Sequence, residues 1–302
     1  MSINLTHISS QVQALAIEVG RFQVEQRKHF QLECVESKHS HDYVSYVDKE
    51  SEKMIVARLR EILPEARFIT EEGTTLQSVT EESECSQQIV SPNDSVQQTA
   101  SRNESSRQTS TLTWIVDPLD GTTNYVHDMA PSAVCIALAD GSDYLLGVVY
   151  ETSRDELFYA TKGGGAWLKH GDEAPVPLHV SQISDIDQAL VMIGYPYDAD
   201  AWRQFCLDIT SRLYGHCASI RSYGSAESEL CYVAAGRIDI YFESFIQPWD
   251  VAAGACILQE AGGRLTDYQG RDDLWRSGRQ VLATNGTLHD AIVREIQAAL
   301  SC

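Results

Sequence analysis

Two amphipathic helices are expected before Pro64. Apolar residues fall three or four positions apart over residues 12–22, which is the spacing of one helix face, and Ser9 or Ser10 can serve as the N-cap. A second helix follows Asp48, carries its apolar residues on one face, and ends before Pro64. Asp48 is therefore expected at or near the start of the second helix.

Uninterrupted apolar runs predict strands in the middle of the chain. Residues 68–70 and 113–116 are two such runs, and each is followed by an acidic residue. Residues 140–143, Asp-Gly-Ser-Asp, are a hairpin signal between two longer runs. The pattern predicts a sheet with strands over residues 133–139, 144–150, 156–160 and 166–168.

The C-terminal part alternates between strand and helix patterns, which indicates α/β layering. We expect strands over residues 189–193 and 238–242, and helices over residues 201–214, 226–235, 251–261 and 288–300. With 302 residues and 43% hydrophobic content, the chain can bury a large core. We expect two closely packed lobes, residues 1–185 with most of the candidate metal ligands and residues 186–302 with the substrate pocket.

One stretch, residues 74–113, fits neither pattern. Of its 40 residues, 22 are Ser, Thr or Gln, and it has no aromatic residue and no glycine. Such a composition buries too little apolar surface to offset the entropy of ordering the chain. We expect a mobile surface insertion, and the alternative is a segment that docks a partner or is phosphorylated. Because it joins Glu71 to Asp117, its motion could gate a site built on those residues.

The segment 114–124, Trp-Ile-Val-Asp-Pro-Leu-Asp-Gly-Thr-Thr-Asn, places two carboxylates three residues apart at the end of an apolar strand. The proline between them has no N–H, so the sheet ladder should stop beside Asp117. After Asp120, a glycine relaxes the backbone, and Thr122 and Thr123 can cap a helix whose N-terminus attracts phosphate. Taken alone, the spacing also fits a plain turn, because Asp-Pro and Asp-Gly are ordinary turn dipeptides.

Further acidic motifs support a metal site. Asp48 ends the segment Asp-Tyr-Val-Ser-Tyr-Val-Asp, Glu71 and Glu72 follow a strand, and Asp250 lies in Trp-Asp-Val-Ala-Ala-Gly. In this order, the motifs span nearly the whole chain and resemble the inositol monophosphatase family of magnesium-dependent phosphomonoesterases. The resemblance implies an α/β fold, a five-layer α/β/α/β/α sandwich of the inositol monophosphatase and sugar phosphatase type, with the active site between two lobes.

The same resemblance implies the metal ligands. Glu71, Asp117 and the backbone carbonyl of Leu119 would hold one cation, and Asp117, Asp120 and Asp250 a second. A third, weaker ion would be bound by Glu71 and mostly by water. Oxygen ligands without a neighbouring thiol favour Mg²⁺ over Zn²⁺. Each acid taken alone could be a helix cap or a solvated charge, as Asp250 could be for the helix that follows it.

Catalytic roles implied by the resemblance fall on Glu71, Thr122 and Asp48. Two cations about 4 Å apart lower the pKa of a bound water and neutralise the leaving alkoxide of an in-line displacement, without a covalent intermediate. The hydroxyl of Thr122, paired with Asp48, would orient or deprotonate that water. Backbone N–H groups of Gly121 and Thr122 would bind the phosphate oxygens.

Substrate contacts are implied for a set of acids and small residues, which suits a polyol: Asp120, Gly121, Thr122, Gly224, Ser225, Ala226, Glu243 and Asp250. Lys38 would support the metal and phosphate network, although a lysine taken alone is more often a solvated charge. Position 123 is a threonine, whereas bisphosphate nucleotidase relatives usually have a lysine there. This difference makes a nucleotide substrate less expected, without excluding it.

Composition narrows the remaining choices. The net charge of −20 argues against nucleic acid or an anionic membrane as a partner, and it requires cations at any site that binds phosphate. Residues 1–6 do not resemble a signal peptide, no run is long enough to span a bilayer, and we expect a cytoplasmic protein. The eight cysteines show no close metal-ligand spacing, and most are expected to be reduced core residues.

We therefore expect a phosphomonoesterase that hydrolyses inositol 1-phosphate or a related polyol or sugar phosphate, with two to three Mg²⁺ per active site. The alternative substrates are fructose 1,6-bisphosphate, a 3′(2′),5′-bisphosphate nucleotide and histidinol phosphate. A different class is a non-catalytic, metal-dependent interaction protein. The resemblance further implies a homodimer and inhibition by lithium.

Overall fold

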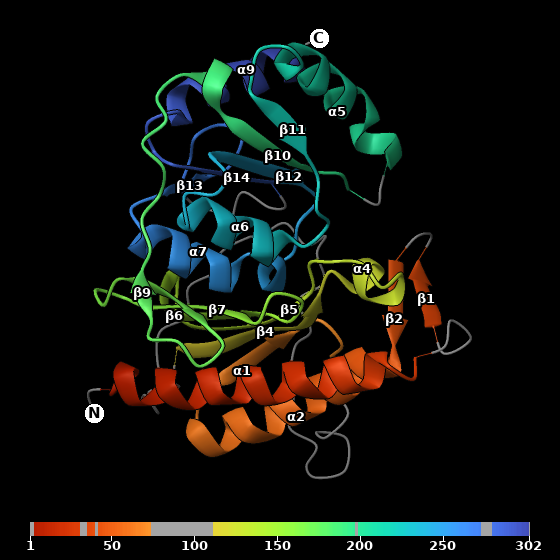
Figure 1. Cartoon of the computed structure of the whole chain (residues 1–302), viewed down its shortest axis with the longest axis vertical. Helices are drawn as coiled ribbons and strands as arrows, with labels where there is room; N and C mark the ends of the chain where they lie inside the picture. Colours follow the sequence, from red (N-terminus) through yellow and green to blue (C-terminus); the bar gives the residue numbers. More distant parts are fainter. Residues whose placement is uncertain are drawn as a thin grey trace, which may run out of the picture.

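The computed structural model describes residues 3–30, 35–39, 42–73, 111–196, 199–272 and 280–301. All but the last three residues of the predicted insertion 74–113 lie outside these ranges. Elements stack in five layers of alternating helices and sheet, from α1 and α2 to α5 and α9 (Figure 1). The expected α/β/α/β/α sandwich is thus confirmed. No described helix is long and apolar enough to cross a membrane.

A seven-stranded sheet forms the second layer. Its strands follow the order of the chain: β3 (Arg67–Thr70), β4 (Leu112–Asp120), β5 (Ala133–Asp140), β6 (Asp143–Glu151), β7 (Glu156–Thr161), β8 (Ala166–His170) and β9 (Val176–Pro177). Only β3 and β4 run parallel, and every other neighbouring pair is antiparallel. The four strands predicted over residues 133–168 are all present.

Helices α1 (Leu5–Arg27) and α2 (Tyr46–Ile62) cover one face of this sheet. Their buried residues form one apolar cluster with Trp114, Val116 and neighbouring residues of the sheet. The first helix begins earlier than predicted because Asn4, rather than Ser9 or Ser10, caps it by accepting from the backbone N–H of His7 at 3.1 Å. Near the C-terminal end of α1, a small ribbon of β1 (Val35–His39) and β2 (Asp42–Ser45) leads into α2.

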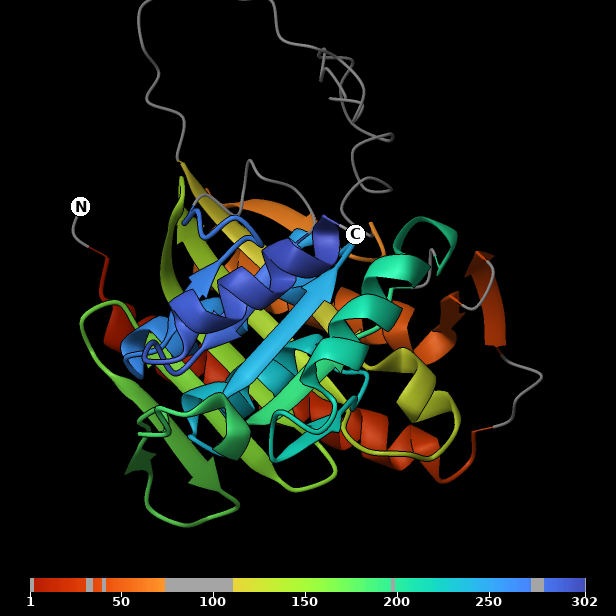
Figure 2. The ribbon, with the colours of Figure 1, turned by 90° about the horizontal axis from the view of Figure 1, so that it is seen from above.

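The fourth layer is a five-stranded sheet with the order β11-β10-β12-β14-β13. Its strands are β10 (Leu190–Gly194), β11 (Ser219–Arg221), β12 (Ile240–Ser244), β13 (Arg264–Thr266) and β14 (Gln280–Thr284). β10 is parallel to β11 and β12, while β14 is antiparallel to β12 and β13. On its outer face, α5 (Ala199–Leu213) and α9 (His289–Leu300) lie side by side (Figure 2). A single-turn helix, η2 (Ile186–Gln188), precedes β10.

Helices α6 (Ala226–Ala234) and α7 (Ala252–Glu260) fill the layer between the two sheets. Nearly every residue of both helices is buried, because each contacts a sheet on one side and a helix on another. Gly147 on β6 allows close approach, since a Cβ there would clash with the carbonyl oxygen of Ala253. The predicted division into two lobes, between residues 185 and 186, remains a prediction. Both sheets pack on the layer formed by α6 and α7, so this layer does not mark a boundary between lobes.

Cysteine placement follows the expectation for the described part of the chain. Cys135, Cys206, Cys217, Cys231 and Cys256 are free thiols, and all except Cys217 are buried. Burial raises the pKa of the thiols of Cys135 and Cys231 well above the ordinary value, which keeps them protonated and unreactive. Cys34, Cys85 and Cys302 lie outside the described residues.

Candidate active site

Glu71 and Asp117 are brought together by the parallel pairing of β3 and β4. Thr70 is in register with Val116, so the next residue of each strand lies at the same edge of the sheet. The backbone N–H of Glu71 donates to the carbonyl of Val116 at 3.3 Å. Glu52 of α2 accepts from the hydroxyl of Thr70 at 3.1 Å and holds the end of β3. Two acids distant in sequence thus become neighbours because their strands are adjacent.

The turn after Asp117 is held by hydrogen bonds from three directions. The backbone N–H of Leu119 donates to Oδ1 of Asp117 at 2.9 Å. The side-chain amide of Gln23, on α1, donates to the carbonyl of Pro118 at 2.7 Å. The hydroxyl of Thr122 lies 2.9 Å from the carbonyl of Leu119. These contacts fix the orientation of the carbonyl and carboxylate oxygens that the sequence proposed as ligands.

Two local expectations for this turn are wrong. The ladder does not stop beside Asp117; β4 continues to Asp120 across an irregularity that contains the proline, so the missing N–H falls where the pairing is interrupted. The threonines do not cap the next helix, α4 (Thr122–Val126), which is only five residues long and starts after Gly121. Gly121 has a φ of 82°, and a Cβ there would lie 2.8 Å from the carbonyl oxygen of Pro131. Glycine is required by both conformation and space.

Asp48 is the third residue of α2 and takes part in a capping box. Its carboxylate accepts from the backbone N–H of Ser45 at 2.9 Å and from the hydroxyl of Ser45 at 2.6 Å. Its other oxygen lies 3.0 Å from the hydroxyl of Thr122. That hydroxyl has one proton to share between Asp48 and the carbonyl of Leu119. Asp48 therefore has both the capping contacts and the contact with Thr122 that the sequence suggested.

Asp120 joins the two sheets through the helical layer. Its carboxylate accepts from the hydroxyl of Ser225 at 2.6 Å and from the backbone N–H groups of Ala226 and Glu227 at 3.1 and 2.9 Å. An acid on β4 thus caps α6, and Glu227 of α6 in turn accepts from the first amides of α7, at Ala253 and Gly254. This pair of caps was missed because each cap belongs to a different element from the helix it serves.

Asp250 lies in a short 3₁₀ turn, η3 (Pro248–Asp250), and does not cap α7 as the simple interpretation had it. Its Oδ2 accepts from the backbone N–H of Gln247 at 2.7 Å. Glu227 serves the start of α7, and Asp250 lines the pocket. The cap interpretation is therefore wrong for α7, although Asp250 does close its own turn.

One pocket of about 260 Å³ collects most of the predicted site residues. Its wall includes ten of them, namely Glu71, Asp117, Leu119, Asp120, Gly121, Thr122, Gly224, Ala226, Glu243 and Asp250. Asp48 and Ser225 lie behind the wall and reach it through Thr122 and Asp120. Lys38 lies in β1, and its side chain is outside the described part of the structure.

Sequence reasoning missed Gly194, Tyr195 and Ser222 of the same pocket, and it named Thr123 and Asn124 only as parts of their motif. Asn124 is buried and donates from its amide to the carbonyls of Pro131 and Tyr223 at 2.8 and 2.6 Å. It joins α4 to the loop before α6, across the two sheets. The asparagine was noticed within its motif, but nothing in the sequence identifies carbonyls 7 and 99 residues away as its partners.

The electrostatics of the pocket are dominated by burial of like charges. Burial raises the pKa of Asp117 well above its ordinary value, and neighbouring Glu71, Asp120 and Asp250 raise it further. Burial likewise raises the pKa of Asp250 and that of Asp48. Burial raises the pKa of Glu243 to about 7. No described Lys, Arg or His forms an ion pair with Asp117, Asp120 or Asp250.

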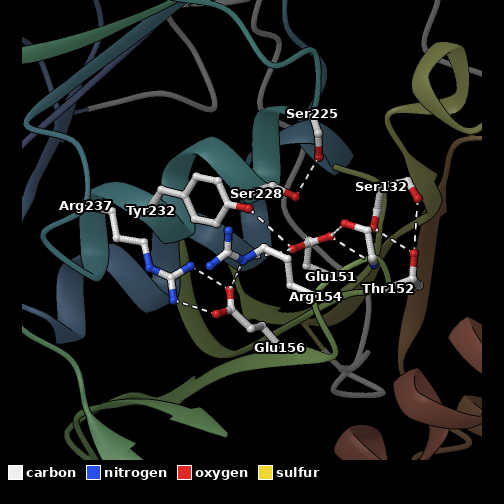
Figure 3. A network of polar contacts seen from close by, with 10 residues as sticks. Ser132, Glu151, Thr152, Arg154, Glu156, Ser225, Ser228, Tyr232 and Arg237 are labelled. Atoms are coloured by element: carbon white, nitrogen blue, oxygen red, sulfur yellow. Dashed lines mark hydrogen bonds and ion pairs between the residues drawn. The ribbon is translucent and has the colours of Figure 1, made fainter. Parts of the chain in front are cut away.

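A second buried acidic pair lies on β6 and β7 and has arginine partners (Figure 3). Glu156 forms a two-pronged ion pair with Arg237 at 2.6 and 2.7 Å, and Arg154 approaches it to 3.3 Å. Glu151 is 4.0 Å from Arg154 and accepts from the hydroxyl of Tyr232 at 3.4 Å. Glu156 is compensated by Arg237 and Arg154 and has the character of a structural ion pair, whereas Glu151 is only 4.0 Å from Arg154 and burial raises its pKa.

The donor set of the pocket fits a hard divalent cation. Among the described residues, no cation pairs with Asp117, Asp120 or Asp250, and a bound cation would offset the burial and repulsion that raise the pKa values of Asp117 and Asp250. As the side chains lie here, no three His, Cys, Asp or Glu side chains of the described residues converge as the ligands of an ion would. The carboxylates of Asp120 and Asp250 already accept hydrogen bonds from backbone N–H groups. To bind an ion as well, each would have to direct a remaining lone pair into the pocket.

Comparison with known proteins agrees with this geometry. The inositol monophosphatase family model matches residues 4–301, and the chain belongs to that family. It is 32% identical over 264 residues to the Nus factor SuhB of Escherichia coli, covering 87% of this chain and 86% of that protein. It is 30% identical over 292 residues to inositol-1-monophosphatase of Bacillus subtilis, covering 97% of each. The crystal structure of the extragenic suppressor protein SuhB from Bartonella henselae superposes with a TM-score of 0.77 at 29% identity, covering 96% of this chain and 98% of that one.

Proposed function

We propose that this chain is a Mg²⁺-dependent phosphomonoesterase that hydrolyses inositol 1-phosphate or a related polyol or sugar phosphate to the alcohol and inorganic phosphate. The observation that carries the proposal is the single pocket lined by Glu71, Asp117, Asp120 and Asp250 beside the glycine-threonine turn. Membership of the inositol monophosphatase family supports the phosphatase class. The inositol-1-monophosphatase of Bacillus subtilis is a relative whose name states this activity.

In this proposal, Glu71, Asp117 and the carbonyl of Leu119 would hold one Mg²⁺, and Asp117, Asp120 and Asp250 would hold a second. When bound, the two ions supply the positive charge that favours attack by water and departure of the alkoxide. The backbone N–H groups of Gly121 and Thr122 bind phosphate oxygens and orient the ester for in-line attack.

The pair formed by Asp48 and Thr122 positions the attacking water. The hydroxyl of Thr122 accepts a hydrogen bond from water while its own proton is shared with Asp48 or with the carbonyl of Leu119. On the leaving-group side, Glu243 and Asp120 accept hydrogen bonds from hydroxyls of a polyol. The small residues Gly224 and Ala226 leave room for its ring.

Phosphate release from inositol 1-phosphate by the purified protein tests this proposal, with Mg²⁺ titrated from zero and EDTA as the control. We expect turnover only with Mg²⁺, and inhibition by lithium through competition at the second ion. Absence of turnover on inositol 1-phosphate, fructose 1,6-bisphosphate, a 3′(2′),5′-bisphosphate nucleotide and histidinol phosphate alike would overturn the catalytic function.

A second candidate is a metal-dependent interaction protein that does not catalyse phosphate release. It is favoured by one observation, namely that a relative covering most of the chain is named Nus factor SuhB. Binding of Mg²⁺, measured by calorimetry, together with inactivity on every phosphate ester would favour this candidate over the phosphatase.

A further inference from the structure

Glu243 is an acid of the pocket that takes no part in the proposed binding of Mg²⁺. It lies on β12, and its partly buried side chain lines the pocket. One carboxylate oxygen, Oε2, accepts from the hydroxyl of Tyr241 at 2.5 Å. No hydrogen bond among the described residues engages the other oxygen, Oε1. Glu243 thus has one oxygen held by the protein and one available to a hydroxyl of the substrate.

Tyr241 is a rigid donor for this contact. It lies two residues before Glu243 on the same strand, so the two side chains project from the same face of the sheet. Its ring is fully buried in the apolar cluster that joins the two sheets. Burial and the nearby charges of Glu243 and Glu229 raise the pKa of the Tyr241 hydroxyl well above its ordinary value, so the hydroxyl keeps its proton and donates it. A closely packed ring has little freedom, and it therefore holds Oε2 in one position.

Gly194, the last residue of β10, provides the space for the side chain of Glu243. The two residues are partners in the parallel pairing of β10 and β12, and both line the pocket. A Cβ at position 194 would overlap Oε2, Cδ and Cγ of Glu243. The side chain of Glu243 therefore lies across the backbone of Gly194, in the space that any larger residue would fill.

This arrangement favours an alcohol that carries hydroxyl groups. Burial raises the pKa of Glu243 to about 7, and the hydrogen bond from Tyr241 opposes that rise and favours the charged form, which accepts hydrogen bonds. A substrate hydroxyl meeting Oε1 would satisfy it, whereas a hydrocarbon would cover a polar oxygen without a partner. A site built in this way discriminates strongly against an analogue that lacks the hydroxyl.

We propose that Tyr241 and Gly194 are positioning residues that determine specificity for hydroxylated alcohols, by holding Glu243 with its free oxygen directed at a ring hydroxyl of the substrate. This inference rests on the proposed phosphatase function and adds the residues that select the polyol. Both residues act through Glu243 and not through the carboxylates proposed to bind Mg²⁺.

Two esters that differ in their hydroxyl groups test the proposal. Inositol 1-phosphate and cyclohexyl phosphate share a six-membered carbon ring, but only the first has further hydroxyls. Tyr241→Phe removes the donor and keeps the aromatic ring. We expect the ratio of kcat/KM for inositol 1-phosphate to that for cyclohexyl phosphate to fall about tenfold, mainly through KM for inositol 1-phosphate, as loss of one hydrogen bond to a charged group implies. An unchanged ratio would overturn the proposal.

Tyr268→Phe is the matched control. Tyr268 is as fully buried as Tyr241, and its hydroxyl lies 3.0 Å from that of Ser244, the neighbour of Glu243 on β12. We expect this variant to keep the wild-type ratio, and both variants to bind Mg²⁺ with wild-type affinity in calorimetry. An equal fall of the ratio in the two variants, or weaker Mg²⁺ binding in Tyr241→Phe, would make Tyr241 a general structural residue and contradict the proposal.

Gly194→Ala tests the same arrangement from the neighbouring strand. The added methyl group meets the end of a flexible side chain, so Glu243 can move aside and the fold should persist. We expect the ratio to fall as in Tyr241→Phe. The double variant should lose no more than the larger single loss, because both changes act through Glu243. Losses that multiply in the double variant would contradict this shared route.

The outcomes separate this inference from the function on which it rests. Hydrolysis of both esters by the wild type, with an unchanged ratio in Tyr241→Phe and Gly194→Ala, removes the inference and leaves the phosphatase intact. Inactivity of the wild type on every phosphate ester in the presence of Mg²⁺ contradicts the phosphatase function, and the inference falls with it.

Discussion

Two of the regions in which the structure encloses acidic side chains differ in one respect. Glu151 and Glu156, on β6 and β7, are accompanied by Arg154 and Arg237 (Figure 3). Asp117, Asp120 and Asp250, at the edge between the two sheets, have backbone N–H groups and each other but no described cationic partner. A buried carboxylate without a cation is costly, so a protein keeps several together only where something else supplies positive charge.

The comparison separates a structural role from a functional one. Glu156 ties the start of β7 to Arg237 in the segment after α6, so its charge is balanced in the folded protein without a bound ion. Asp117, Asp120 and Asp250 have no cationic partner among the described residues; burial and the neighbouring acids raise the pKa values of Asp117 and Asp250, and bound cations would balance these charges. Charge balance, more than burial or acid count, identifies the candidate active site.

The largest expected effect comes from Asp117→Asn, which removes the carboxylate proposed to touch both ions. We expect phosphate release to fall at least about a thousandfold, equivalent to about 4 kcal/mol of activation free energy. In EDTA the variant should unfold at a higher temperature than the wild type, because one of the repelling charges is gone. Asp143→Asn, in an exposed pair with Lys162, is the control and should change neither quantity. Undiminished turnover in Asp117→Asn would refute the proposed mechanism.

The next-largest expected effect is that the stabilisation of the protein by Mg²⁺ depends on pH. In the folded state the pKa values of Asp117 and Asp250 are raised, so the folded protein binds more protons than the unfolded one. Their contribution to the free energy of unfolding is fully present below the unfolded pKa, near 4, and is lost as pH rises through the folded values. Added Mg²⁺ should therefore raise the Tm more at pH 8 than at pH 5. At saturating ion and pH 8, we expect the free energy of unfolding to rise by about 3 kcal/mol. Calorimetric scans with EDTA or Mg²⁺ measure this, and a shift independent of pH would argue against a carboxylate site.

Substitution of the arginine-paired acid Glu156 should lower the stability of the protein, whereas Asp117→Asn should raise it in EDTA. Glu156→Gln removes the charge that Arg237 contacts and should lower stability by about 2 kcal/mol, less than a fully buried pair because 31% of the Arg237 side chain is exposed. Phosphate release and the response to Mg²⁺ should stay normal. Arg203→Gln breaks only an exposed pair with Asp200 and should change stability by less than about 0.5 kcal/mol. Loss of the Mg²⁺ response in Glu156→Gln would erase the distinction between the two acidic regions.

A smaller effect is expected from Gln23, which holds the turn that contains the proposed ligands Asp117 and Leu119. Gln23→Leu removes the amide donor to the carbonyl of Pro118, which lies between two proposed ligands. We expect Mg²⁺ to bind about tenfold more weakly, as is usual when a residue that orients metal ligands is lost. Gln13→Leu, on the same helix, is the control, because the amide of Gln13 donates to Ser9 rather than to the turn after Asp117. Mg²⁺ affinity measured by calorimetry should separate the two variants, and equal affinities would remove the proposed role of Gln23.

Several elements of the fold follow from local patterns. The four-residue spacing predicted the helix that became α9, and the apolar runs on either side of Asp140–Asp143 predicted the hairpin of β5 and β6. Short strands without a strong run, such as β11, β13 and β14, were not predicted. Their place is decided by pairing with β10 and β12 rather than by their own residues.

Site residues divide in a similar way. The acids were found because their types and order resemble a family with a known metal site. Gln23, Asn124 and Glu227 were not found, because each acts on a backbone group of another element, between 7 and 100 residues away. A side-chain amide in a helix carries no local mark of the carbonyl it binds.

By itself, the sequence determined the periodicities of the long helices and strands and the identity of the acids, because helical spacing, apolar runs and motif order are properties of neighbouring residues. The tertiary structure alone decided that Asp120 caps α6 and that Glu227 caps α7. It also decided that Gly194 of β10 lies beside Glu243 of β12. These relations depend on which layers pack against each other. That packing is decided by burial of the apolar faces of helices and sheets from all parts of the chain, so no single segment reveals it.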